Sequence, residues 1–194
     1  NVVVPGYDPE DPNSTAPLNL TNCTIYVVGK LNGTVNTDQV FFSNYGASRG
    51  YGLGISDTLP DYVSFWTNGG GEMRSSGPID EDGRYYLLVG SLQSFTKKLI
   101  VNDCVEDEDT GSVFYSDGTA VSVGALGDGT QFLIGDIAEI QVYDGFIEST
   151  HIGVVDALVT KYGLDNTCLE ENLDTVSLSA LTFFGTDSNG TVDI

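Results

Sequence analysis

Short apolar runs separated by turn residues make up most of this chain. Runs such as 25–28 and 85–89 are hydrophobic on both faces, as the inner strands of packed sheets often are. Asn-Gly, Asp-Gly or Gly-Gly pairs, which reach the positive φ of tight turns, separate many of the runs. Candidate strands lie at about 23–29, 39–43, 50–55, 62–67, 84–90, 97–102, 112–116, 119–124, 131–143 and 175–184. The pattern predicts an all-β chain folded as an antiparallel β-sandwich.

The segment 135–164 adds one short helix to this picture. After a first strand, apolar residues recur at helical spacing at Ile152, Val155, Leu158, Val159 and Tyr162. Ser149 or Thr150 is in position to cap a helix expected near 149–162. Gly163 stands where a left-handed residue ends many helices. The segment therefore predicts a strand, a turn, an amphipathic helix and a glycine stop.

Three groups of residues in this segment carry a family resemblance: Gly135-Asp136-Ile137-Ala138-Glu139, Tyr143-Asp144 and Lys161-Tyr162-Gly163-Leu164. With the upstream segments 23–33 and 97–103, they make the chain resemble laminin-G-like modules of the concanavalin-A-like lectin/glucanase superfamily over about residues 17–165. The resemblance implies a concanavalin-A-like jelly roll, and it raises the expectation of calcium at a loop-lined rim. The chain departs from the family pattern at Asp103, where a hairpin glycine is expected, and at 166–194, which run past the usual end.

The two ends differ from the middle of the chain. Residues 1–18 hold four of the six prolines and predict an extended N-terminal arm. Residues 19–194 suit a single β-sandwich domain, with 166–194 as a C-terminal strand or tail. The ends are expected either to close their own sandwich or to complete the sheet of a neighbouring subunit.

The charge of the chain excludes several partners. There are 7 Lys and Arg against 28 Asp and Glu, a net charge of −21, so nucleic acid and anionic membranes would be repelled. No run of 18 apolar residues is present, so membrane insertion is not expected. Such acidity is typical of halophilic hosts and equally of acidic extracellular proteins that bind calcium.

Catalysis is not expected, although the superfamily includes glycoside hydrolases. Their chemistry needs two carboxylates that face one cleft. Asp136 and Glu139 are three residues apart in a candidate strand, so alternation sends them to opposite faces. Glu139 is predicted instead to accept hydrogen bonds near the helix or a loop. His151, the sole histidine, is predicted to be an exposed residue without a catalytic role.

Acidic loops are the candidate metal sites. The runs 80–82 and 106–109 are dense in the hard oxygen donors that calcium prefers, and Asp128 could add to either. The predicted calcium ligands are Asp80, Asp82, Glu106, Asp107, Asp109 and Asp128. The alternative is a set of solvated acidic loops that hold no metal.

Three cysteines allow at most one intrachain disulfide. Cys23 opens an early strand, and Cys168 follows a helix that is expected to pack back near the chain start. The predicted pair is therefore Cys23–Cys168. The alternative is that all three cysteines are buried and free.

Five Asn-X-Ser/Thr sequons, more than the composition predicts by chance, indicate an exported chain. They lie at Asn13, Asn19, Asn22, Asn32 and Asn189. We expect glycosylation at these positions and an extracellular, cell-surface or virion-surface location.

These features predict a non-enzymatic recognition or adhesion module that binds glycans or surface proteins, with calcium as the candidate cofactor. The alternative is a structural subunit that binds copies of itself, such as a virion decoration or fibre protein, a surface-layer component or an extracellular filament component. Tyr45, Tyr51 and Tyr115 are candidate sugar-stacking residues in or near loops. Trp66 falls within an apparent strand and is expected in the core.

Overall fold

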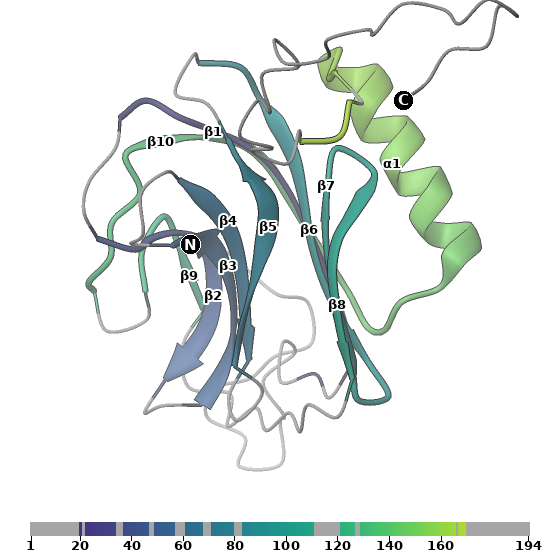
Figure 1. Cartoon of the computed structure of the whole chain (residues 1–194), viewed down its shortest axis with the longest axis horizontal. Helices are drawn as coiled ribbons and strands as arrows, with labels where there is room; N and C mark the ends of the chain where they lie inside the picture. The colour runs from purple at the N-terminus through teal and green to yellow at the C-terminus, as the bar shows by residue number, and fades with distance from the viewer. Residues whose placement is uncertain are drawn as a thin grey trace, which may run out of the picture.

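The chain folds as a sandwich of two antiparallel sheets with one helix on its outside (Figure 1). The computed structural model describes residues 20, 22–33, 37–46, 49–56, 61–67, 71–79, 83–110, 121–126, 129–165 and 167–169. Within those ranges each sheet has five strands. The predicted all-β sandwich with one short helix is confirmed.

Sheet A has the strand order β10-β1-β6-β7-β8. Its strands are β1 (Cys23–Leu31), β6 (Tyr86–Gln93), β7 (Thr96–Val101), β8 (Cys104–Thr110) and β10 (Gly135–Tyr143). Sheet B has the order β5-β4-β3-β2-β9. Its strands are β2 (Gln39–Gly46), β3 (Arg49–Ile55), β4 (Tyr62–Thr67), β5 (Glu72–Pro78) and β9 (Val121–Val123). The first described strand thus pairs with the last, as in a jelly roll.

Most predicted strands are present, and two observed strands, β5 and β8, are not among the predicted ones. β5 and β8 carry polar and acidic residues, so they lack the apolar pattern that identified the other strands. The candidate strands at 112–116 and 175–184 lie outside the described residues, as does the predicted arm at 1–18.

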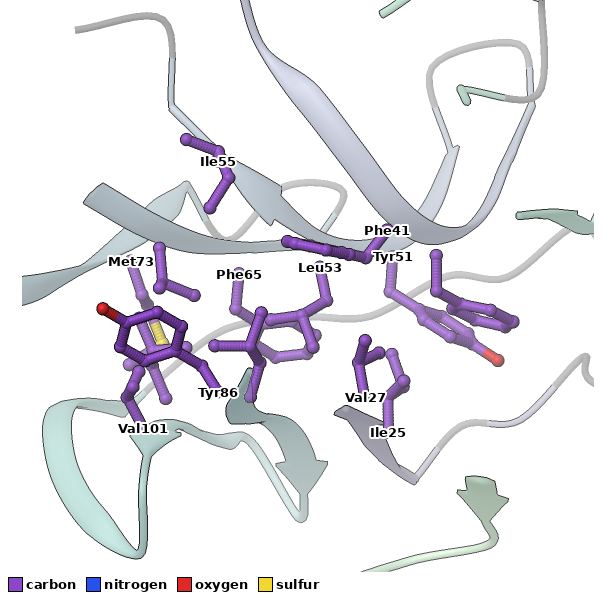
Figure 2. Packing of buried hydrophobic residues seen from close by; sticks show 14 of the residues in the cluster. Ile25, Val27, Phe41, Tyr51, Leu53, Ile55, Phe65, Met73, Tyr86 and Val101 are labelled. Carbon is purple, nitrogen blue, oxygen red and sulfur yellow. The ribbon is translucent and has the colours of Figure 1, made fainter. Parts of the chain in front are cut away.

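Aromatic rings from sheet B pack in the core between the sheets (Figure 2). Two of these rings lie against glycines of sheet A. A β-carbon at Gly90 would lie 2.4 Å from the Phe65 ring, and one at Gly29 would lie 2.6 Å from the Phe41 ring. Both phenylalanine side chains are fully buried. Because the interior is close-packed, a larger residue at either glycine would force the facing ring to move.

Helix α1 (Glu148–Tyr162) packs on the outer face of sheet A (Figure 1). Its Val155 and Leu158 join a second buried cluster with Tyr26, Val28, Leu87, Val89 and Ile100 of the sheet. Gly163 ends the helix in the left-handed conformation, at φ 61°, as predicted. The predicted cap is wrong: Ile147 occupies the capping position, and no side chain caps the helix.

The turn between β7 and β8 accounts for the departure from the family pattern at Asp103. Asn102 and Asp103 have φ of 50° and 67°, so two non-glycine residues adopt the conformation of a tight hairpin turn. Asn and Asp tolerate the left-handed region better than most residues, which makes this substitution for glycine compatible with the hairpin.

The predicted Cys23–Cys168 disulfide is wrong. Cys168 bonds to Cys104, with a Cα–Cα distance of 5.4 Å. After α1 the chain crosses to the β7–β8 turn, where the Asn102 side chain donates a hydrogen bond to the Thr167 carbonyl. Cys23 instead points between the sheets as a buried thiol, and burial raises its pKa to about 12.

Candidate functional site

The outer face of sheet B displays a row of side chains that runs across all five strands. Directly paired positions in this row are Ser122, Ser43, Gly52, Trp66 and Glu72. A second row, two residues along the strands, contains Gly54, Ser64 and Arg74. The intervening residues Tyr51, Leu53 and Phe65 point into the core, so both rows face away from it.

Trp66 lies flat on the backbone of β3. A β-carbon at Gly52 would come within 2.2 Å of the Trp66 ring, and one at Gly54 within 3.0 Å of it. Trp66 is absent from the buried core and keeps part of its surface exposed. The expectation that Trp66 belongs to the core is therefore wrong: alternation in β4 buries Val63 and Phe65 and turns Trp66 outward.

Glu72 and Arg74 lie beside the Trp66 ring on the neighbouring strand β5. Their side chains form an ion pair, with 2.8 Å between the Arg74 guanidinium and the Glu72 carboxylate. Both side chains are partly exposed, at 41% for Arg74 and 34% for Glu72. Ser43 and Ser64 are buried, whereas the larger side chains of Trp66, Glu72 and Arg74 keep part of their surface exposed. We call these three residues the sheet B platform.

The carboxylates of β10 lie on one face, not on two. A bulge opposite Val28 and Gly29 inserts Ala138 between the paired positions of Ile137 and Glu139. Ile137 packs against the core between the sheets, and Asp136 pairs with Lys30 on the opposite, outer face. The predicted opposite orientation of Asp136 and Glu139 is therefore wrong.

Both β10 carboxylates are held by partners of their own. Glu139 accepts hydrogen bonds from Lys161, Gln141 and Tyr162, which lower its pKa to about 2. This confirms the prediction that Glu139 accepts hydrogen bonds near the helix. Hydrogen bonds from Asn32 and Lys30 also lower the pKa of Asp136. A general acid in glycoside hydrolysis needs a raised pKa, and neither carboxylate has one.

His151 is buried, contrary to the prediction of an exposed residue. Its ring lies 3.0 Å from the Tyr26 hydroxyl through Nδ1 and 3.6 Å from the Asp103 carboxylate through Nε2. The ring also stacks on Tyr26 and packs against Phe146. Burial, followed by the charges of Tyr143 and Glu148, raises the Tyr26 pKa to about 12. His151 therefore joins the helix to the sheet.

The acid run at 106–109 is strand β8, so the expectation of a loop is wrong there. Lys97 pairs with Asp109 at 3.5 Å, and Lys98 pairs with Glu108 at 3.1 Å, across the β7–β8 ladder. Glu106 accepts hydrogen bonds from Ser76 of β5. Within the described ranges no three acidic, histidine or cysteine side chains are grouped as a metal site. Asp80, Asp82 and Asp128 lie outside those ranges, and calcium binding stays a prediction.

The remaining predicted sugar-binding and glycosylation positions also lie partly inside and partly outside the described residues. Tyr51 is fully buried in the core, and Tyr115 lies outside the described residues, as do Asn13, Asn19 and Asn189. The Asn22 side chain accepts a hydrogen bond from the Ser94 backbone, and the exposed Asn32 side chain donates one to Asp136. The described part of the chain has no helix of the length and apolar character needed to cross a membrane.

Solved structures share this fold at low sequence identity. Domain 4 of an extracellular GH43 arabinanase from Geobacillus stearothermophilus, solved with arabinotriose, matches with a TM-score of 0.55 and 13% identity over 72% of this chain and 68% of that one. The CBM40 of the Ruminococcus gnavus IT-sialidase, bound to α2,3-sialyllactose, matches with a TM-score of 0.56 and 17% identity over 77% of this chain and 90% of that one.

This chain also covers 40% of the length of a Bacteroides ovatus protein, with a TM-score of 0.57 and 14% identity over 69% of this chain. No protein-family model matches the sequence, and no curated protein matches it either. These likenesses agree with the predicted concanavalin-A-like jelly-roll fold. The narrower resemblance to laminin-G-like modules stays a prediction.

Proposed function

We propose that this chain is a non-catalytic, extracellular or surface-displayed module that binds glycans on the outer face of sheet B. The observation that carries the proposal is the Trp66 ring, laid flat over Gly52 and Gly54 beside the Glu72–Arg74 pair. Sugar-binding sites combine an aromatic surface with a few polar groups that fix orientation. The solved structures of this fold that hold arabinotriose and sialyllactose add support.

The non-catalytic part of the proposal is supported by the state of the β10 carboxylates. Glu139 and Asp136 are both ion-paired, at 2.8 Å to Lys161 and 3.1 Å to Lys30, and both have lowered pKa values. They lie on sheet A, whereas the sheet B platform is on the other sheet. The platform has one carboxylate, Glu72, where glycoside hydrolysis uses two.

A glycan array tests this function with Trp66→Ala and a matched control. Phe95→Ala removes another partly exposed aromatic ring, 63% exposed, at the β6–β7 turn of sheet A. We expect the wild type and Phe95→Ala to bind the same spots and Trp66→Ala to lose them while keeping its circular dichroism spectrum. A wild type that binds no spot, with or without calcium, contradicts the proposal.

A second candidate, a structural subunit that binds copies of itself, is favoured by a different observation. Val121, Val123, Phe132 and Ile134 expose 47%, 52%, 65% and 42% of their surface around β9, which ends the described order of sheet B. Exposed apolar groups beside a sheet edge favour association. Light scattering at low and high salt tests this candidate: assembly that is lost in Phe132→Ser supports it, and a monomer at both salt concentrations contradicts it.

A further inference from the structure

We propose that the sheet B platform selects uncharged sugars over carboxylated ones, and that Glu72 sets this preference. The inference rests on the proposed glycan-binding function and assigns the class of ligand for the same face. It follows from how Glu72 and Arg74 are paired, not from the fold.

Glu72 and Arg74 offer a ligand both hydrogen-bond donors and acceptors. A guanidinium has five N–H donors and no acceptor, whereas a carboxylate only accepts. Glu72 and Arg74 stand two residues apart on β5, both turned outward, with their charged groups 2.8 Å apart. Together they present donors and acceptors side by side with little net charge. Sugar hydroxyls both donate and accept, so they match such a pair.

An acidic ligand would bind unfavourably beside this pair. A carboxylated sugar would seek the Arg74 guanidinium, where bidentate binding is strongest. Glu72 already binds that group, and its charge would repel the incoming carboxylate. The whole chain, at −21, adds a repulsive field of the same sign. Glu72 thus discriminates by an unfavourable contact with the wrong ligand.

The contribution of Trp66 to binding does not depend on the charge of the ligand. Its ring presents an apolar face with a negative quadrupole, so it suits the C–H groups on the flat side of a sugar ring. Trp66 should therefore contribute to binding in all variants. Selectivity is expected to change only when the Glu72–Arg74 pair is altered.

The experiment is a glycan array on which each neutral oligosaccharide is printed beside its carboxylated counterpart, read with wild type, Glu72→Gln and Glu148→Gln. Glu148 is an exposed acid of α1 on sheet A, so its variant removes one charge away from the platform. We expect the wild type to favour the neutral spots. Glu72→Gln should raise the acidic-to-neutral ratio about fivefold, the equivalent of ~1 kcal/mol for one partly exposed charge pair. Glu148→Gln should leave the ratio nearly unchanged.

The outcomes separate the two proposals. A wild type that binds acidic spots as well as neutral ones, or a Glu72→Gln variant with an unchanged ratio, overturns the selectivity and leaves glycan binding standing. An equal rise in Glu148→Gln overturns the specific role of Glu72, because net charge alone would then explain the effect. A blank array overturns glycan binding and the selectivity together. Glu72→Ala, checked by its melting temperature, repeats the test in case the glutamine variant folds poorly.

Discussion

Gly52 lies directly opposite Trp66 in the β3–β4 pair, and a β-carbon at Gly52 would come within 2.2 Å of the Trp66 ring. The absent side chain on β3 is what allows the indole of β4 to lie flat across its neighbour. Gly54, two residues along β3, leaves room for the Trp66 ring in the same way. The position of the candidate sugar-stacking surface is therefore fixed by two glycines that lie beneath the Trp66 ring.

Gly52→Ala is predicted to reduce glycan binding while leaving the core intact, because the added methyl group lifts the Trp66 ring off β3. Binding by calorimetry to a glycan identified on the array should weaken by about tenfold or more, which corresponds to ~1.4 kcal/mol. Gly153→Ala is the matched control: that glycine is helical and a β-carbon there meets nothing within 4 Å. The control should bind normally and melt at a slightly higher temperature, since Ala favours helix by about 1 kcal/mol. Equal binding by both variants would contradict the assigned face.

Much of the fold could be predicted from the sequence because it depends on local patterns. Short apolar runs located β1 and β4, and helical spacing with Gly163 located α1. The orientation of Trp66 required a choice between two faces of one strand, both of which carry an aromatic residue. A signal was present in the alternation Gly50-Tyr51-Gly52-Leu53-Gly54, because a strand that buries its large residues turns its glycines outward.

Other features depend on contacts that no local pattern encodes. The bulge at Ala138 shifts the alternation of side chains between the two faces of β10 by one residue. The spacing of apolar residues in the sequence does not indicate this bulge. β8 is a strand despite its acid run because Lys97 and Lys98 lie across from Asp109 and Glu108. Cross-strand pairs of opposite charge stabilise a sheet, so the tertiary contact overrides a weak strand propensity.

Glu139 is predicted to make the free energy of unfolding depend on pH. The pKa of Glu139 is about 2 in the folded protein, below its ordinary value of 4.5. Its contribution to stability is therefore fully present above pH 4.5 and is lost as the pH falls towards 2. Glu139→Gln should lower the free energy of unfolding at neutral pH by no more than about 1 kcal/mol, since the partner Lys161 is largely exposed. Thermal melts should show this difference shrinking as pH falls from 4.5 towards 2. A difference that grows in acid would contradict the assignment.

His151 is predicted to hold the first turn of α1 on sheet A. His151→Ala removes a buried ring, its contact with the Tyr26 hydroxyl and its pairing with Asp103. We expect a loss of about 2–4 kcal/mol in the free energy of unfolding, measured by urea denaturation. The neighbouring Ile152, 53% exposed, provides the control, because Ile152→Ala should change stability by less than about 0.5 kcal/mol. Similar values for the two variants would show that His151 has no special part in docking the helix.

The Cys104–Cys168 bond is predicted to fix the segment that follows α1 against the β7–β8 turn. It closes a sequence separation of 64 residues, so its removal should lower the free energy of unfolding by about 2–5 kcal/mol. Cys104→Ser with Cys168→Ser tests this in chemical denaturation, because the double variant leaves no unpaired partner. Alkylation followed by mass spectrometry gives an independent check. The native protein should resist modification, since Cys23 is buried and its raised pKa keeps the thiol protonated. After unfolding without reductant, one cysteine should be modified and the peptides of Cys104 and Cys168 should remain linked. Three modified cysteines under those conditions would contradict the pairing.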